Sequence, residues 1–404
     1  MTAGGVGDGS MRLPVVLAAL AGGVAAAMQI GKASAAMPLL LAEFGVSLTA
    51  VSSYLSVVSL GAALLGLTIG LAAQRFGPLR TGVAGLAILS LASLVGAAAT
   101  TWPVLFAARI VEAAGTPLVV ASMPALVQSA CGPARRLVGL GIWAAWLPLG
   151  IVLAMFLTVA LGDRLGWRAL YLGAGILPLL AIAALLLSRP DAPRPTAAVA
   201  ATGFRRMPPA LLAMAVIFTL FSAIYMTLTG FLPSIAKTGL GFSLDNAALL
   251  AGGMALLIVV GNLLATVLLV RGIPAHLVLA LAFATMGVSA ALFLFDGLPV
   301  PQRILAGVVF NVAAGVAPGV IWTCVPLLSH RLELGAALIS GVFYQASGVG
   351  QFAGPLLGGL AVDVTGNWLA CLAVMLPCAL AAIWLSLGSH VNPSSTAETT
   401  RPAP

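Results

Sequence analysis

Three ionisable side chains lie inside long apolar stretches of the sequence. Lys32 is the only charged residue between Arg12 and Glu43, while Arg109 and Glu112 lie three positions apart in a second apolar stretch. A charge at membrane depth costs about 3 kcal/mol on insertion scales, so such residues face a cavity or a partner of opposite charge. Because two cations accompany one carboxylate, the trio carries a surplus positive charge, which favours a small anion as its ligand.

The spacing of these residues predicts that they meet. Residues three apart share one face of a helix, so Arg109 and Glu112 project together. Lys32 lies about 14 Å below the outer end of its predicted helix, and Arg109 and Glu112 lie about 9 and 14 Å below the same end of theirs. We therefore expect one shared cavity. Three interpretations remain open: an anion site, a closed ion pair that only joins two helices, or a carboxyl group that exchanges a proton.

The composition places these residues in a membrane protein. Of 404 residues, 61% are hydrophobic and 7% are charged, whereas soluble domains carry about 25% charged residues. The net charge of +8 arises from basic residues in short loops, which sets membrane orientation and does not indicate nucleic-acid binding. The four cysteines form no CxxC pair and the three histidines are scattered. We therefore expect no metal site, no cofactor and no enzymatic activity.

Twelve apolar segments approach or exceed the length of about 20 residues that a membrane-spanning helix needs. They are too long and too evenly apolar for barrel strands, so they predict an all-α membrane protein with twelve transmembrane helices. The predicted segments are 13–41, 48–73, 81–100, 103–129, 137–160, 168–187, 210–235, 245–270, 276–295, 303–328, 335–360 and 368–388.

The predicted helices fall into two halves. Segment 189–209 contains five prolines, four arginines and no long apolar run, which predicts a cytoplasmic linker. It separates a six-helix bundle at 13–188 from a second at 210–388, with tails at 1–12 and 389–404. The stretch AAGTPLVVASMPALV (113–127) is similar to AAGVAPGVIWTCVPLL (313–328). Duplicated six-helix halves with a site between them at the membrane midplane are a plan of secondary transporters.

Basic residues predict the orientation of the chain. Outside the helices, twelve Lys and Arg residues fall on one side of the predicted membrane and four on the other. The positive-inside rule then places both termini in the cytoplasm. The abundance of Ala, Gly and Arg favours a bacterial cytoplasmic membrane. Trp102, Trp167 and Trp368 lie near predicted outer ends and are interpreted as interfacial belt residues.

Several motifs resemble those of the major facilitator superfamily. GLAAQRFGPL (70–79) is similar to the family's G-x-x-x-D-R-x-G-R-R loop, and RIVEAAG (109–115) to its R-x-x-x-G-x-G element. In the first loop Gln74 replaces the acidic residue. The resemblance implies a cytoplasmic gate, whose residues here are Gly70, Gln74, Arg75, Gly77 and Arg80.

Two further stretches carry a resemblance. Residues 123–143 are similar to the cyanate-type and nitroimidazole-type branch of the family. GQFAGPLLGG (350–359) resembles an antiporter signature that belongs in the fifth helix, and the alternative is close helix packing through small residues.

The family resemblance also implies which helices line the central cavity: the first and fourth in one half, the seventh and tenth in the other. Polar residues on these helices become candidates for substrate binding, and the alternative for each is a helix–helix hydrogen bond. Besides Lys32 and Arg109, these candidates are Gln29, Thr116, Tyr225 and Asn311.

The resemblance implies a monomeric secondary transporter in the lipid bilayer that works by alternating access. Its solute is expected to be a small anion, with Glu112 as the proton-coupling group. The alternative is a proton-driven exporter of drug-like or neutral metabolites, which would depend on Glu112 but would not require an anionic substrate.

Overall fold

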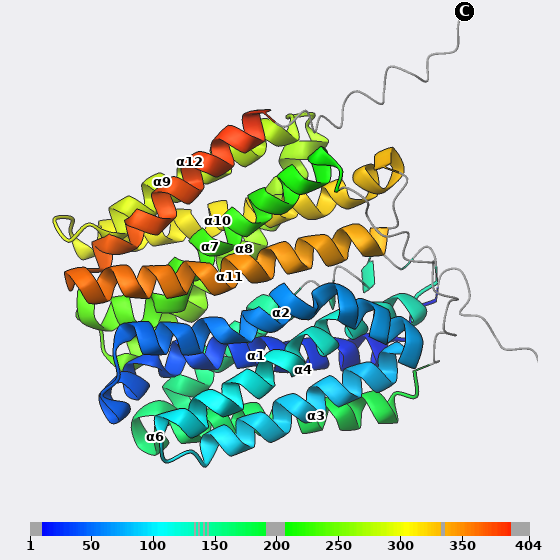
Figure 1. The fold of residues 1–404 in the computed structure, drawn as a ribbon, viewed down its shortest axis with the longest axis horizontal. Helices are drawn as coiled ribbons and strands as arrows, with labels where there is room; N and C mark the ends of the chain where they lie inside the picture. The colour runs from blue at the N-terminus through cyan, green and yellow to red at the C-terminus, as the bar shows by residue number, and fades with distance from the viewer. Residues whose placement is uncertain are drawn as a thin grey trace, which may run out of the picture. The chain divides into compact units, whose positions relative to one another are not determined.

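A computed structural model of the chain describes residues 10–132, 135, 138–139, 142–143, 145–190, 207–332 and 336–388. Within these residues all regular secondary structure is helical, apart from an isolated β-bridge between Met11 and Cys131. Figure 1 shows the main elements, which are α1 (Leu13–Phe44), α2 (Leu48–Phe76), α3 (Pro78–Ala97), α4 (Trp102–Ser129), α6 (Trp146–Leu187), α7 (Pro209–Gly239), α8 (Leu244–Val270), α9 (Ala275–Leu294), α10 (Val300–Leu332), α11 (Ala336–Thr365), the short 3₁₀ helix η2 (Trp368–Cys371) and α12 (Leu372–Gly388).

The predicted all-α membrane fold is confirmed. Among the described residues, ten helices are long and apolar enough to cross a membrane. α6 contains two of the predicted segments. They form two arms that are separated at Gly166, where the backbone leaves helical geometry with a φ of 71°. Its first arm begins at Trp146, later than the predicted start at 137, and residues 138, 139, 142 and 143 are also helical. Most of the predicted linker, 191–206, lies outside the described residues, as do the tails at 1–9 and 389–404.

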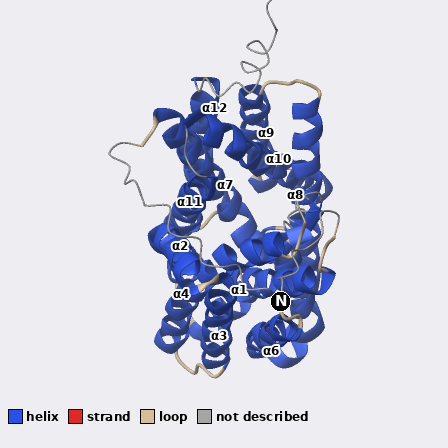
Figure 2. Cartoon of the chain, turned by 90° about the vertical axis from the view of Figure 1, so that its right-hand side faces the viewer, coloured by secondary structure: helices blue, strands red, loops and turns tan. Residues whose placement is uncertain are grey.

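The chain divides into two compact units. The first comprises Met1–Gly203 with Gly230–Gly253, and the second comprises Phe204–Thr229 with Met254–Pro404. In the first unit α1 and α3 each pack against both α4 and α6, and α2 packs on α4 (Figure 1, Figure 2). In the second, α9 packs against α10 and α12. The predicted domain boundaries at 13–188 and 210–388 stay a prediction.

Glycines bring helices into close backbone contact in both units. In the first unit, a Cβ added to Gly150 on α6 would lie 2.3 Å from Ala27 of α1; in the second, one on Gly350 of α11 would lie 2.0 Å from the Thr219 carbonyl oxygen of α7. These distances leave no room for a side chain, so the glycines permit backbone contact. Gly354, one turn after Gly350, approaches α7 in the same way. The GQFAGPLLGG stretch thus packs α11 onto α7.

An apolar core fixes α1 beside its neighbours in the first unit. It includes Val16 on α1, Leu89 on α3, Met123 on α4 and Leu185 on α6, all of which are fully buried. Arg12, at the start of α1, donates hydrogen bonds to the carbonyl oxygens of the two residues that follow α6, at 3.3 and 2.8 Å. The first half of α1 is therefore fixed to its neighbours by this core, and its start is joined to the end of α6 by Arg12.

Candidate functional site

Lys32, Arg109 and Glu112 form one buried ion-pair cluster. Lys32 Nζ lies 2.5 Å from Glu112 Oε1, and Arg109 Nη1 lies 2.7 Å from Glu112 Oε2. Each carboxylate oxygen thus contacts a different cation. The side chains of Lys32 and Arg109 are 0% exposed and that of Glu112 is 2% exposed. The predicted meeting at one level is confirmed, but in this structure the three side chains are enclosed and do not line an open cavity.

The Arg109 guanidinium is held by main-chain oxygens of two helices. Its Nη1 donates to the Gln29 carbonyl oxygen of α1 at 2.6 Å, and its Nε donates to the Tyr54 carbonyl oxygen of α2 at 3.1 Å. Its Nη2 is buried and has no hydrogen-bond partner among the described residues. A buried guanidinium with unused donors is costly unless another acceptor reaches it. Arg109 therefore retains capacity to bind one more acceptor.

Lys32 has a different set of neighbours. Besides Glu112, its Nζ donates to Ser93 Oγ of α3 at 2.7 Å, and Ser93 in turn donates to the Tyr171 carbonyl oxygen of α6 at 3.0 Å. Its Nζ also lies 4.3 Å from the centroid of the Tyr171 ring. The Tyr171 and Tyr54 hydroxyl groups share a hydrogen bond of 2.5 Å. Helices α1, α2, α3, α4 and α6 all contribute to the cluster.

Small residues beside Glu112 explain how so many helices reach it. Pro117 cannot donate a helix hydrogen bond to the Ala113 carbonyl group, and Gly61 of α2 packs against that carbonyl oxygen, where a Cβ would come within 1.7 Å. On α3, a Cβ on Gly85 would lie 2.9 Å from the Gly115 carbonyl oxygen. The sequence AAG after Glu112 thus lets two neighbouring backbones approach α4 closely.

An aromatic and ionic cluster lies at the end of α1 that follows Lys32. Glu43 accepts a hydrogen bond from Trp167 Nε1 at 2.6 Å and pairs with Arg168 at 2.7 Å. Phe44 packs against both Trp102 and Trp167. The interpretation of Trp167 as an interfacial belt residue is wrong, because its side chain is 2% exposed. It joins the end of α1 to the second arm of α6 instead.

Two predicted substrate-binding residues lie beside the ion-pair cluster. Gln29 Nε2 donates to the Ala174 carbonyl oxygen of α6 at 2.8 Å. Thr116 Oγ1 donates to the Glu112 carbonyl oxygen at 3.2 Å, within α4. Both side chains are buried. In this structure Gln29 makes a helix–helix hydrogen bond and Thr116 a bond inside its own helix, and a binding role for either stays a prediction.

The other two predicted binding residues belong to the second unit. The Tyr225 ring on α7 stacks on Phe221 with a centroid distance of 5.7 Å. Asn311 Nδ2 on α10 donates to the Gly307 carbonyl oxygen at 2.9 Å, while its buried Oδ1 has no hydrogen-bond partner among the described residues. Both residues are buried. Their role in substrate binding stays a prediction.

The predicted gate residues lie around the connection of α2 to α3. Gly70, Gln74 and Arg75 are on α2, and the side chains of Gln74 and Arg75 lie outside the described part of the chain. Gly77 connects the helices with φ 86° and ψ 144°, a conformation that favours glycine. Arg80 is exposed. The gate assignment stays a prediction.

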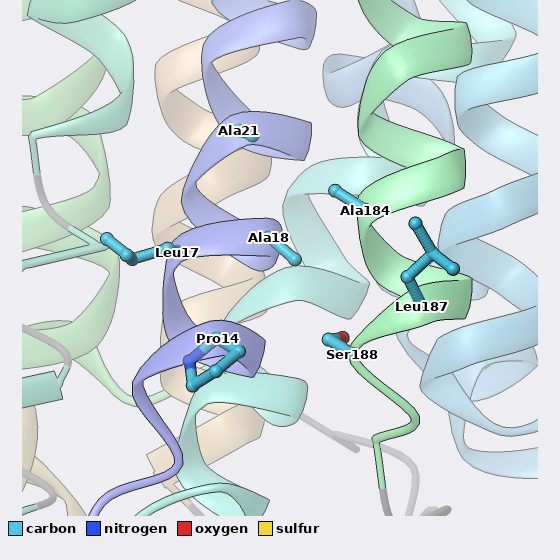
Figure 3. A pocket seen from close by; sticks show the side chains of 7 residues that line it. All are labelled: Pro14, Leu17, Ala18, Ala21, Ala184, Leu187 and Ser188. Carbon is cyan, nitrogen blue, oxygen red and sulfur yellow. The ribbon is translucent and has the colours of Figure 1, made fainter.

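A shallow apolar hollow of about 380 Å³ lies away from the cluster. Figure 3 shows it between the first turns of α1 and the last turn of α6, lined by Pro14, Leu17, Ala18, Ala21, Ala184, Leu187 and Ser188. Ala21 precedes Lys32 by about 16 Å along α1. The hollow therefore does not belong to the ion-pair cluster.

Sequence reasoning missed Ser93, Tyr54 and Tyr171. Ser93 is one of many serines in apolar segments, so nothing in its surroundings distinguishes it. A signal existed for the tyrosines, because the chain has only four of them. Two of the four share a hydrogen bond beside the buried cations, and a tyrosine buried in a membrane helix needs a partner for its hydroxyl group.

Comparisons with known proteins agree with this architecture. The sequence profile of the Major Facilitator Superfamily matches residues 19–348. The chain is 27% identical, over 359 residues, to the 3-(3-hydroxy-phenyl)propionate transporter of Escherichia coli strain K12, which covers 81% of this chain and 83% of that protein. It is 28% identical, over 184 residues, to the arabinose-proton symporter of the same strain, which covers 46% of this chain and 39% of that protein.

Solved structures share the fold. A crystal structure of a bacterial homolog to the human lysosomal transporter Spinster, in an inward-facing and occupied conformation, matches with a TM-score of 0.78 and 16% identity, covering 95% of this chain and 99% of that one. The D-xylose-proton symporter matches with a TM-score of 0.73 and 17% identity, covering 93% of this chain and 97% of that one. At these identities the likeness concerns the fold alone.

Proposed function

Since the chain belongs to the Major Facilitator Superfamily, we propose that it is a secondary active transporter that moves a small organic anion together with a proton. As the sequence predicted, it is a membrane transporter and not an enzyme. The observation that carries the proposal is the buried cluster in which Glu112 alone faces both Lys32 and Arg109. The cluster lies on α1 and α4, two of the helices that the family resemblance places on the substrate pathway.

The charge balance of the cluster links a proton to an anion. When Glu112 is ionised, it is the counter-ion of both cations, and the cluster holds one surplus positive charge. When Glu112 is protonated, two buried cations lose their counter-ion, which is strongly unfavourable in a low-dielectric site. A substrate carboxylate can then take the place of the Glu112 charge, and Arg109 offers it a bidentate fork. One proton and one anion thus bind together, without changing the net charge of the cluster.

The relatives support both halves of this proposal. The propionate in the name of the Escherichia coli relative is a carboxylate on an aromatic group, so we propose organic carboxylates, aromatic ones first, as the substrate class. The arabinose-proton and D-xylose-proton symporters support the proton as the coupled ion. In this account Gln29, Thr116, Tyr225 and Asn311 contact the remainder of the solute. Gly70, Gln74, Arg75, Gly77 and Arg80 form the cytoplasmic gate.

The proposed setting follows from the loops and the relatives. The basic loops place both termini in the cytoplasm, and the bacterial relatives support a bacterial cytoplasmic membrane. We propose a monomer, since the family mechanism of two rocking halves needs a single chain. Import or export is then set by the direction of the proton gradient.

A ligand-stabilisation assay tests the substrate class. The melting temperature of the purified protein is followed with 3-(3-hydroxyphenyl)propionate, benzoate, a lipophilic cation and arabinose, because a ligand that binds the folded state raises it. We expect a carboxylate to stabilise wild type and to lose this effect in Lys32→Met. The matched control is Lys237→Ala, which removes an exposed cation at the end of α7 and should leave the effect intact. Stabilisation by a carboxylate that persists in Lys32→Met contradicts the anion site.

The enclosure of the cluster favours a second candidate, a proton-driven exporter of drug-like or neutral solutes. Because Glu112 already contacts both cations and all three side chains are buried, the cluster can act as a proton-responsive element that never touches the solute. This candidate predicts stabilisation by the lipophilic cation or the neutral compound, unchanged in Lys32→Met. Glu112→Gln would then abolish proton-coupled efflux of that compound.

A further inference from the structure

Two tyrosine rings lie against the two cations of the cluster. Lys32 Nζ is 4.3 Å from the centroid of the Tyr171 ring, and Arg109 Cζ is 5.2 Å from that of Tyr54. Both rings are buried, with exposed fractions of 0% and 1%. The face of an aromatic ring carries negative electrostatic potential and attracts a cation within about 6 Å, most strongly where water is excluded. The rings thus face the charge that Glu112 leaves unbalanced.

The main-chain carbonyl oxygen of each tyrosine is also linked to the neighbouring cation by hydrogen bonds, directly for Tyr54 and through Ser93 for Tyr171. The Tyr54 carbonyl oxygen accepts a hydrogen bond from Arg109 Nε at 3.1 Å. The Tyr171 carbonyl oxygen accepts one from Ser93, whose hydroxyl oxygen accepts from Lys32. The hydroxyl groups of the two tyrosines are bonded to each other at 2.5 Å. This bond joins α2 to α6 beside the two rings.

We propose that Tyr171 and Tyr54 are positioning residues for the cation pair: their ring faces balance the surplus charge and keep Lys32 and Arg109 in place when a substrate carboxylate replaces Glu112 as counter-ion. This inference rests on the proposed function for its role in transport. The charged and titratable groups of the described cluster are Lys32, Arg109, Glu112 and the two tyrosines. Glu112 is the member that the anion displaces, and the rings remain.

The ring faces, and not the hydroxyl groups, contact the two cations, because the two hydroxyl groups bind each other. Tyr171→Phe keeps the ring face, whereas Tyr171→Leu removes it. With 3-(3-hydroxyphenyl)propionate as the probe, we expect Tyr171→Leu to raise KM about tenfold and to change kcat less than about twofold, which is the pattern of weakened binding. Tyr171→Phe should restore KM to within about threefold of wild type.

A double-mutant cycle tests the contact without any substrate. The unfolding equilibrium is compared for wild type, Lys32→Met, Tyr171→Leu and the double variant. If the ring only fills space, the two changes are independent and their effects add. If the ring holds the cation, Tyr171→Leu shifts the unfolding equilibrium about tenfold less when Lys32 is absent. The control cycle pairs Lys32→Met with Phe283→Leu, which removes a buried ring of α9 in the second unit, and should be additive.

The two measurements separate the inference from the function on which it rests. Coupling in the cycle together with the KM effect is the expected result. Coupling without any uptake of the probe supports the positioning role and counts against the carboxylate proposal. An additive Lys32–Tyr171 cycle overturns the inference whatever the transport result. If Tyr171→Leu does not fold, the same cycle is run with Tyr54→Leu and Arg109→Met, and additivity there overturns the inference equally.

Discussion

Replacing Glu112 by Gln tests how much of the fold depends on the shared carboxylate. The amide keeps the size of the side chain, but its oxygen can accept from only one cation and its NH₂ group is a donor that faces the other. Lys32 and Arg109 then remain buried, at 0% exposure, without the carboxylate that both contact. Removing one partner of a buried ion pair costs about 3–5 kcal/mol. We expect a loss of this size in the free energy of unfolding.

The measurement is denaturant unfolding of the purified protein in detergent micelles, for Glu112→Gln, Lys32→Met, the double variant and Glu43→Gln. Adding Lys32→Met to Glu112→Gln should recover part of the loss, because one of the two uncompensated cations disappears. The control is Glu43→Gln, whose side chain is 40% exposed and pairs with Arg168; an exposed pair contributes about 1 kcal/mol or less. The reasoning is refuted if Glu112→Gln is as stable as the Glu43→Gln control. It is also refuted if adding Lys32→Met to Glu112→Gln lowers the free energy of unfolding by as much as Lys32→Met does in wild type.

Three further predictions concern the helix contacts around the site. Gly350→Ala places a Cβ against the backbone of α7 and should sharply reduce the yield of monodisperse protein on size-exclusion chromatography. Gly253→Ala, which meets nothing within 4 Å, should leave the yield unchanged, and equal yields would contradict the packing account. Gly77→Ala forces a non-glycine residue to a positive φ of 86° and should cost about 1–3 kcal/mol; an unaltered melting temperature would contradict this. Trp167→Phe keeps the packing of the ring but loses the hydrogen bond to Glu43, so it should cost about 1 kcal/mol in unfolding free energy, and a cost as large as that of Trp167→Ala would refute the assignment to the hydrogen bond.

The sequence predicts the helices and the charged trio for a simple physical reason. Membrane helices must be long and apolar, so their positions can be read from composition. Lys32, Arg109 and Glu112 stand out because the rest of the two apolar stretches that contain them is uncharged. The depth of each residue follows from the helical rise, and the observed contacts of Glu112 with both cations agree with those depths.

The enclosure of the trio could not be predicted, and the rarity of tyrosine marked Tyr54 and Tyr171 without showing that they meet. Whether a cation lines a cavity or lies sealed between helices depends on how closely the helices approach. That approach is set by pairs such as Gly61 with Ala113 and Gly85 with Gly115, which are distant in the sequence. Tyr54 and Tyr171 meet across 117 positions. Trp167 illustrates the same limit, because its place near a helix end fits either an interfacial belt or a buried hydrogen bond to Glu43.

The coupling of one proton to one anion is tested most directly in proteoliposomes. An internal pH dye follows protons while uptake of labelled 3-(3-hydroxyphenyl)propionate is measured, and potassium with valinomycin sets the membrane potential. We predict one proton for each carboxylate taken up, with a rate that does not depend on the potential, and loss of both movements in Glu112→Gln. Uptake that follows the membrane potential, or proton-coupled uptake that persists in Glu112→Gln, would contradict the account.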